Sequence, residues 1–322
     1  MKKIFLRIAA LAVCLYLLPG SASAAELLVP GGQIVGLQLC HDTVTVAAFD
    51  DKMGAQTKAA GLQVGDKIVS INGGKIQTAQ DVLTALEHSD GTVEMRVNRN
   101  GKEKKLRVEP QITSQGPRLG VYLRDGITGI GTVTWYDPDS GKFGTLGHGV
   151  NDSSGKLLDM TQGKAYEASV VSVKKGECGE PGQLKGGVAA KQEVGWLYRN
   201  TQQGVFGINR SGWKGEALPV GDEEDVHAGA ATIRSTVSGE KVQEYSVEIL
   251  KIYPESRSDG RNLLLKVTDP ELLEVTGGIV QGMSGSPIVQ DGKLIGAVTH
   301  VLVNDPTTGY GIFIENMLDA AA

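Results

Sequence analysis

A serine set among glycines near the C-terminal end is the part of this sequence best suited to chemistry. The run from Gly282 to Pro287 reads Gly-Met-Ser-Gly-Ser-Pro. A serine hydroxyl becomes a nucleophile when a base takes its proton and amide donors stabilise the oxyanion that forms. Glycines beside the serine let the backbone turn sharply, so the amides of Gly282 and Ser284 can converge on one oxygen. The run therefore predicts a nucleophile with an oxyanion hole, and a plain turn between two strands is the alternative.

The base should be one of the five histidines. His148 lies between two glycines at a strand end, where little steric cover suits a reactive side chain. His227 follows the acidic stretch 222–225, and a solvated surface position accounts for it better. His300 ends the apolar strand 294–299. We expect His148 to be the base, with His300 and His227 as alternatives.

A carboxylate should complete the site by orienting the imidazole and stabilising its charged form. Asp269, in the run Lys-Val-Thr-Asp-Pro, and Asp152, shortly after His148, both qualify. Spacing does not choose between them. In chymotrypsin-like enzymes the aspartate lies well before the serine, whereas Asp269 is only fifteen residues before Ser284. The pattern alone leaves the carboxylate open.

Length and composition describe the frame that must position these residues. A chain of 322 residues has room for two domains. Its 44 glycines, beside many Val, Ile and Thr residues, favour short strands joined by tight turns. The net charge is −5 with no basic stripe, so we expect no nucleic-acid binding. Cys40 and Cys178 are expected to stay unpaired, and the cysteines are too few for a zinc site, so we expect no metal and no cofactor.

The first 25 residues carry an export pattern. A basic start with Lys2, Lys3 and Arg7 precedes an apolar stretch over residues 8–18, and Ala-Ser-Ala follows at 22–24. An apolar stretch of this length is short for a bilayer, which needs about 20 residues. Residues 1–25 are therefore expected to be a signal peptide, with a retained membrane anchor as the alternative.

The segment 30–110 resembles a PDZ domain of the bacterial type. The resemblance rests on the run Val35, Gly36, Leu37, Gln38 and Leu39, on Ala-Gly-Leu at 60–62, on Gly-Asp at 65–66 and on Ile-Asn-Gly at 71–73. A helix capped by Thr78, with Asp81 in its first turn, fits the pattern. PDZ domains bind an extended peptide as an added strand, so the resemblance implies peptide binding at residues 35–39. It also allows PDZ self-association, and it removes His41 and His88 from the candidate bases.

The segment 111–322 reads as strands and turns, with only a hint of a short helix at residues 315–319. Such a pattern suits a double β-barrel or a sandwich. The fold class is therefore mainly β, with an N-terminal α+β PDZ domain followed by a β-barrel peptidase domain.

The serine run also resembles that of chymotrypsin-like serine peptidases, and the alignment selects Ser284 over Ser286. The resemblance implies substrate binding along the strand 296–300, through Thr299 and His300. It places Gly278 where a trypsin-like enzyme keeps an acidic pocket residue, which argues against strict Lys/Arg specificity.

The whole chain is similar to the sporulation stage IV B serine peptidases of endospore-forming bacteria. The similarity covers the domain order and the runs 144–150, 266–270, 277–287 and 296–306. It implies a catalytic triad of His148, Asp269 and Ser284. It also implies secretion across the inner forespore membrane, into the space between the forespore membranes, and cleavage of the enzyme's own N-terminal segment. The enzyme would then cut a membrane-bound regulator of an intramembrane protease, which activates a late mother-cell sigma factor.

Two other functions remain alternatives. A general exported quality-control protease would combine the same domains, but in those enzymes the peptidase precedes the PDZ domain. A noncatalytic PDZ scaffold would lack a member of the triad, and all three residues are present.

Overall fold

The computed structural model describes residues 26–152, 155–254 and 259–322. The expected signal peptide or anchor, residues 1–25, lies outside the described residues. Strands dominate the described part and the helices there are short, so the prediction of a mainly β protein is confirmed. Within that part, no helix is both long and apolar enough to cross a membrane.

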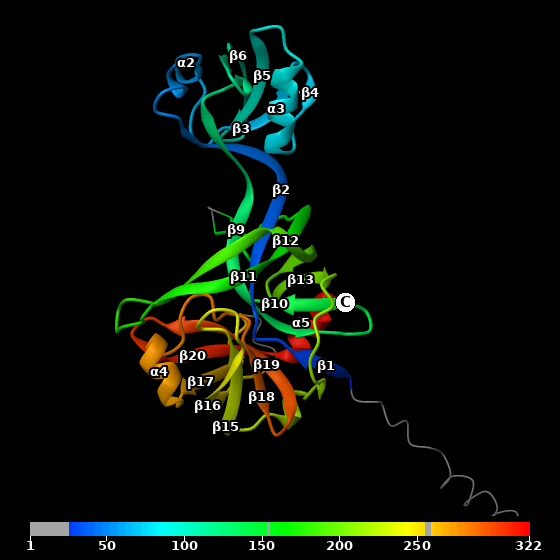
Figure 1. Cartoon of the computed structure of the whole chain (residues 1–322), viewed down its shortest axis with the longest axis vertical. Helices are drawn as coiled ribbons and strands as arrows, with labels where there is room; N and C mark the ends of the chain where they lie inside the picture. The colour runs from blue at the N-terminus through cyan, green and yellow to red at the C-terminus, as the bar shows by residue number, and fades with distance from the viewer. Residues whose placement is uncertain (1–25, 153–154, 255–258) are drawn as a thin grey trace, which may run out of the picture.

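A first barrel forms the middle of the molecule in Figure 1. Its described strands follow the order β2-β9-β10-β13-β12-β11, and β11 pairs back to β2. Val133, Phe143 and Val205 lie in its core. The strands are β2 (Ile34–Phe49), β9 (Val121–Tyr136), β10 (Lys142–Thr145), β11 (Gln162–Lys174), β12 (Gln183–Thr201) and β13 (Gly204–Asn209), and β1 (Leu27–Pro30) and β14 (Leu218–Pro219) extend the sheet beyond β9.

A second closed barrel follows in the chain, in the order β15-β16-β17-β20-β19-β18. Ile233, Tyr245 and Leu265 belong to its core. Its elements are η1 (Glu223–Asp225), β15 (Gly229–Ser235), β16 (Gln243–Ile252), β17 (Leu263–Val267), α4 (Pro270–Thr276), β18 (Pro287–Gln290), β19 (Lys293–Leu302), β20 (Asp305–Phe313) and α5 (Ile314–Ala321). The predicted double barrel and the short terminal helix are both confirmed.

A smaller α+β unit stands at the top of Figure 1. Its helix α3 begins as predicted, because Thr78 Oγ1 accepts the Asp81 amide at 3.1 Å and Asp81 accepts the Thr78 amide at 2.8 Å. Val82 and Leu86 on this helix are buried in the core of the unit. The elements are α2 (Gly54–Ala59), β3 (Lys67–Ile71), β4 (Gly74–Lys75), α3 (Ala79–Glu87), β5 (Val93–Arg99), β6 (Lys102–Val108), β7 (Gln111–Thr113) and β8 (Gly116–Arg118).

The small unit is inserted into the first barrel rather than placed before it. Strands β2 and β9 pair from Ile34 opposite Thr132 to Phe49 opposite Val121, and we call residues 34–49 and 121–136 the β2–β9 ribbon. One end of the ribbon lies in the barrel core and the other in the core of the small unit. The boundaries expected at 30–110 and 111–322 therefore do not describe this arrangement, because one alternating apolar pattern serves two cores along the same strand.

The predicted peptide-binding segment, residues 35–39, was placed wrongly. It pairs with β9 on one side and with β11 on the other, so it offers no free edge to a peptide. A groove of about 310 Å³ lies instead between α3 and the start of β9, lined by Leu86, Leu119 and Val121 among others. Residues 119–123 repeat the apolar-Gly-apolar-X-apolar pattern of residues 35–39. The two runs could not be told apart without the strand pairing.

Candidate active site

The structure brings His148 and Ser284 to one cleft. His148 follows β10 of the first barrel, and Ser284 precedes β18 of the second. Both line a cavity of about 550 Å³, together with Thr299 and His300 of β19. The cleft therefore joins the predicted nucleophile, the predicted base and two predicted substrate-binding residues.

The local backbone presents His148 on a tight turn. Leu146 and Gly147 have φ values of 71° and 67°, in the left-handed region that costs a non-glycine residue energy. A Cβ on Gly147 would stand 2.9 Å from Thr299 Cγ2, so a larger residue there would push against the floor of the cleft.

The protonation of His148 suits a general base. Its Nδ1 lies 3.0 Å from the Gly149 carbonyl oxygen. Because a carbonyl only accepts, Nδ1 carries the proton and Nε2 keeps its lone pair in the neutral ring. Burial lowers the pKa of His148, while the bond to Gly149 opposes that shift. The imidazole is therefore neutral near pH 7 and able to take a proton.

Ser284 rather than Ser286 is free to react. The Ser284 hydroxyl donates to the Thr299 carbonyl at 2.9 Å, and within the described residues no hydrogen bond joins it to His148. The Ser286 hydroxyl is fully buried and bonds Ser235 Oγ at 3.1 Å. This geometry supports Ser284 as the nucleophile, a prediction that rested on resemblance alone.

The two predicted oxyanion amides are held in place by their neighbours. The Gln281 carbonyl accepts the Leu184 amide at 2.8 Å, and the Met283 carbonyl accepts the Ser286 amide at 2.9 Å. In a trans peptide the N–H points opposite to the C=O, so the orientations of the Gly282 and Ser284 amides are fixed. Neither amide donates to an acceptor in the described part of the chain, which leaves both for an oxyanion.

Thr132 of the β2–β9 ribbon also holds this loop. Its hydroxyl donates to the Gly282 carbonyl at 2.8 Å, and its amide donates to the Ser284 carbonyl at 3.1 Å. Gly285 lies so close to Thr132 that a Cβ there would stand 2.1 Å from the Thr132 carbonyl oxygen. Neither Thr132 nor Leu184 could be predicted from a local pattern, because each contacts this loop from a distant segment of the chain.

The structure does not bring Asp269 to His148. Its carboxylate accepts the amides of Leu272 at 3.0 Å and Ser246 at 3.2 Å, and it caps the N-terminus of α4. Asp152 accepts the Lys156 amide at 3.2 Å within a turn. Neither aspartate lines the cleft. The geometry therefore gives Asp269 a structural role, contrary to the triad that the resemblance implies.

Asp269→Asn separates these two roles. The amide oxygen of asparagine can still cap α4, so we expect this variant to keep most of its kcat/KM on a peptide substrate. Asp269→Ala removes both acceptors and should cost about 0.5–2 kcal/mol of stability, measured by denaturant unfolding. A loss of about 10⁴ in kcat for Asp269→Asn with unchanged stability would instead indicate a triad aspartate.

Of the predicted substrate-binding residues, Thr299 lies at an open strand edge in the cleft, whereas Gly278 lies outside it. Strand β18 pairs with β19 only as far as Ala297, so the edge of β19 beside Ser284 is open from Thr299 onward. Gly278 does not line the cleft. A Cβ on Gly278 would stand 2.1 Å from the Pro306 carbonyl oxygen, so this glycine permits close packing rather than substrate contact.

His300 lies beside His148 in the cleft, with 5.5 Å between the ring centroids. Its Nδ1 is buried and has no hydrogen-bond partner among the described residues. Burial, then the nearby His148 and Arg261, lower the pKa of His300 to about 4, and Asp259 opposes them. His300 is thus held neutral near pH 7 and forms part of the cleft wall beside His148.

Stability should fall as the pH drops from about 6.5 to about 4. The unfolded chain binds protons at His148 and His300 from pH 6.5 downward, whereas folded His300 resists protonation until about pH 4. The unfolded state then binds more protons, so the free energy of unfolding falls with the pH in that window. Denaturant midpoints at several pH values measure this slope, which His300→Phe should reduce. If the slope were unchanged in His300→Phe, this histidine would not be the cause of the pH dependence.

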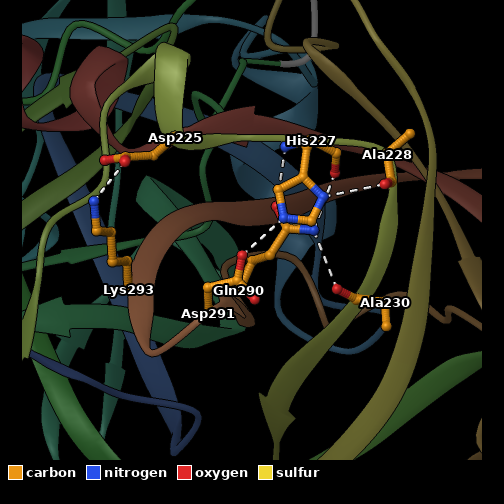
Figure 2. A network of polar contacts seen from close by, with 7 residues as sticks. All are labelled: Asp225, His227, Ala228, Ala230, Gln290, Asp291 and Lys293. Carbon is orange, nitrogen blue, oxygen red and sulfur yellow. Dashed lines mark hydrogen bonds and ion pairs between the residues drawn. The ribbon is translucent and has the colours of Figure 1, made fainter.

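His227 does not line the cleft, in agreement with the surface position predicted for it. Its side chain is 57% exposed, and Nε2 lies 2.7 Å from Asp291 in the β18–β19 turn. Figure 2 shows this network, in which Gln290 accepts the His227 amide and Lys293 pairs with Asp225. Asp291 raises the pKa of His227. Within the described residues, no group of His, Cys, Asp and Glu side chains could hold a metal ion.

Comparison with curated proteins gives partial matches. The zinc metalloprotease RasP of Geobacillus kaustophilus is 35% identical over 66 residues, which cover 20% of this chain and 16% of that protein. The putative zinc metalloprotease Atu1380 of Agrobacterium fabrum is 38% identical over 99 residues, covering 30% and 25%. The chain therefore spans at most a quarter of the length of these two relatives.

Comparison with solved structures also gives partial matches. The active form of the Rv3671c protease from M. tuberculosis is 15% identical with a TM-score of 0.36, covering 61% of this chain and 75% of that one. The PDZ domain of the SdrC-like protein from Listeria monocytogenes is 25% identical with a TM-score of 0.23, covering 26% and 90%.

Family profiles match most of the described chain. The PDZ domain profile matches residues 55–99, within the small α+β unit. The profile of the SpoIVB peptidase S55 family matches residues 115–318, which include His148 and Ser284 of the cleft. The chain belongs to the SpoIVB peptidase S55 family, and it is a serine peptidase that carries a PDZ domain.

Proposed function

We propose that this enzyme is a regulatory endopeptidase of endospore formation. It cleaves its own N-terminal segment and then a membrane-bound regulator of an intramembrane protease, which leads to activation of a late mother-cell sigma factor. The observation that carries the proposal is the match of residues 115–318 to the SpoIVB peptidase family. The export pattern in residues 1–25 supports action outside the forespore's inner membrane, in the space between the forespore membranes.

The cleft provides a route for peptide hydrolysis. Ser284 turns its hydroxyl from the Thr299 carbonyl to His148 Nε2, which takes the proton as Ser284 Oγ bonds the scissile carbon. The amides of Gly282 and Ser284 hold the oxyanion. His148 then gives its proton to the leaving nitrogen, and the C–N bond breaks. Water, deprotonated by His148, releases the acyl group and restores the serine.

The substrate's own backbone assists the first step. The Thr299 carbonyl on the open edge of β19 is an acceptor for the N–H of the residue before the scissile bond. A peptide amide bound there competes with the Ser284 hydroxyl for this oxygen. The hydroxyl is thereby released toward His148.

The groove between α3 and β9 supplies a second peptide site. One edge of β9 pairs with β2 at residues 121–124, and the other faces α3. An extended peptide can add there as a strand. The tail of a protein substrate, or a segment of a second copy, is the partner we propose for it.

Complementation tests the proposal. In an endospore-forming bacterium that lacks its own family member, the wild-type chain should restore a late mother-cell sigma reporter, and Ser284→Ala should not. The N-terminus of the mature protein, mapped by mass spectrometry, should be shortened only with Ser284 intact. A general exported protease would instead degrade unfolded casein at many sites and leave the reporter silent.

A further inference from the structure

The cleft around Ser284 has apolar walls from two parts of the chain. The second barrel supplies Ile279, Val280 and Val301, and the β2–β9 ribbon supplies Leu39, Ile127 and Ile130. The ribbon is the same strand pair that carries the PDZ unit. The same two strands therefore carry the inserted unit and form one wall of the cleft.

No Asp, Glu, Lys or Arg among the described residues lines the cleft, although Asp259 and Arg261 act on His300 from outside the lining. Its ionisable side chains are His148 and His300, and burial lowers the pKa of each. A charged substrate side chain buried there would lose its hydration and find no residue of opposite charge in the described lining, whereas an apolar side chain would gain by leaving water.

The polar groups set the direction of a bound peptide. The scissile carbonyl belongs at the Gly282 and Ser284 amides, and the N–H of the same residue belongs at the Thr299 carbonyl. The side chain of that residue then lies by the second-barrel wall. Ile279 and Val280 come just before Gly282, whose amide binds the oxyanion, and Val301 comes two residues after Thr299 on β19.

The peptide after the scissile bond leaves toward the ribbon. A second cavity of about 610 Å³ continues from the cleft, and the two share Leu37, Gly129 and Ile130. It runs along residues 183–188 at the start of β12, where the exposed Lys185 is the charged residue in its described lining. The ribbon wall is therefore the one that the residues after the cleaved bond contact.

We propose that this peptidase selects apolar side chains on both sides of the cleaved bond, and that the β2–β9 ribbon sets the preference on the C-terminal side. The inference rests on the proposed peptidase role of Ser284 and names the substrate class of that site. Because different walls contact the residues before and after the cleaved bond, the two preferences can be altered separately.

A defined peptide mixture, with cleavage sites mapped by mass spectrometry, measures both preferences in the full-length protein. Ser284→Ala gives the background. We expect Leu, Ile, Val, Met and Phe to exceed Asp, Glu, Lys and Arg at both flanking positions by about tenfold or more, since even one methylene in an apolar pocket can discriminate about tenfold.

Single acidic substitutions separate the two walls. Val301→Asp should raise cleavage after Lys and Arg, and Ile130→Asp should raise cleavage before them. Val303→Asp and Ile112→Asp are matched controls, because these residues are 48% and 79% exposed and lie outside the cleft. Both controls should keep the wild-type preferences. Ile127→Asp replaces Ile130→Asp if thermal melting shows that the latter does not fold.

Four results would overturn the inference. A wild-type preference for charged residues contradicts it directly, and so do folded Val301→Asp and ribbon variants with unchanged preferences. Ser284-dependent cleavage without an apolar preference would sink this inference alone. No Ser284-dependent cleavage of any peptide would sink the peptidase role of Ser284 as well.

Discussion

Ser284→Ala is expected to lower kcat by about 10⁶-fold, to the level left by binding and the oxyanion hole. The reaction needs the hydroxyl of this side chain, which in the resting site donates to the Thr299 carbonyl. Because alanine fits the same backbone, the variant should fold normally. Initial rates on a peptide substrate, with circular dichroism to confirm folding, measure the effect.

Ser286→Ala is the matched control, since it makes the same change two residues away. The Ser286 hydroxyl bonds Ser235 and faces the core. Its loss should cost about 1 kcal/mol of stability and leave kcat nearly unchanged. If Ser286→Ala were inactive and Ser284→Ala active, the assignment of the nucleophile would be reversed.

Gly282→Ala should lower kcat by about 10²–10³-fold, the usual cost of one oxyanion donor. Gly282 has a φ of 102°, and a Cβ there would stand 3.0 Å from Leu184 Cβ. The peptide must rotate to relieve this, which turns the Gly282 amide out of the hole. KM should change much less than kcat, because the amide matters most once the oxyanion has formed.

Gly292→Ala controls for backbone strain alone. Gly292, in the β18–β19 turn, also has a positive φ of 76°. A Cβ at this position would meet nothing within 4 Å. This variant should lose about 1 kcal/mol of stability and keep its kcat. An equal loss of kcat in both variants would show that strain, and not the oxyanion amide, is responsible.

The sequence was informative where function depends on neighbouring residues. The glycines around Ser284 indicated a sharp turn, and Gly282 and Gly285 adopt positive φ there. The glycines around His148 indicated little steric cover, whereas the structure half-buries this side chain just after a tight backbone turn. The capping pattern of Thr78 and Asp81 predicted the start of α3. In each case the signal and the structure lie within a few residues of each other.

The sequence was uninformative where function depends on pairing between distant segments. The residues of β2 were predicted to belong to the PDZ segment alone, yet Leu37 and Val44 lie in different cores. The family resemblance implied a catalytic role for Asp269, but Asp-Pro is also a common helix start, and α4 begins there. Long-range hydrogen bonds such as Thr132 to Gly282 leave no local pattern at all.

A fluorophosphonate probe tests the central assignment most directly, because it forms a covalent bond only with an activated serine. Tryptic peptides of the labelled full-length protein, sequenced by mass spectrometry, locate the adduct. We predict a single adduct on Ser284, absent from Ser284→Ala and strongly reduced in His148→Ala. Labelling of Ser286, or equal labelling with and without His148, would contradict the account.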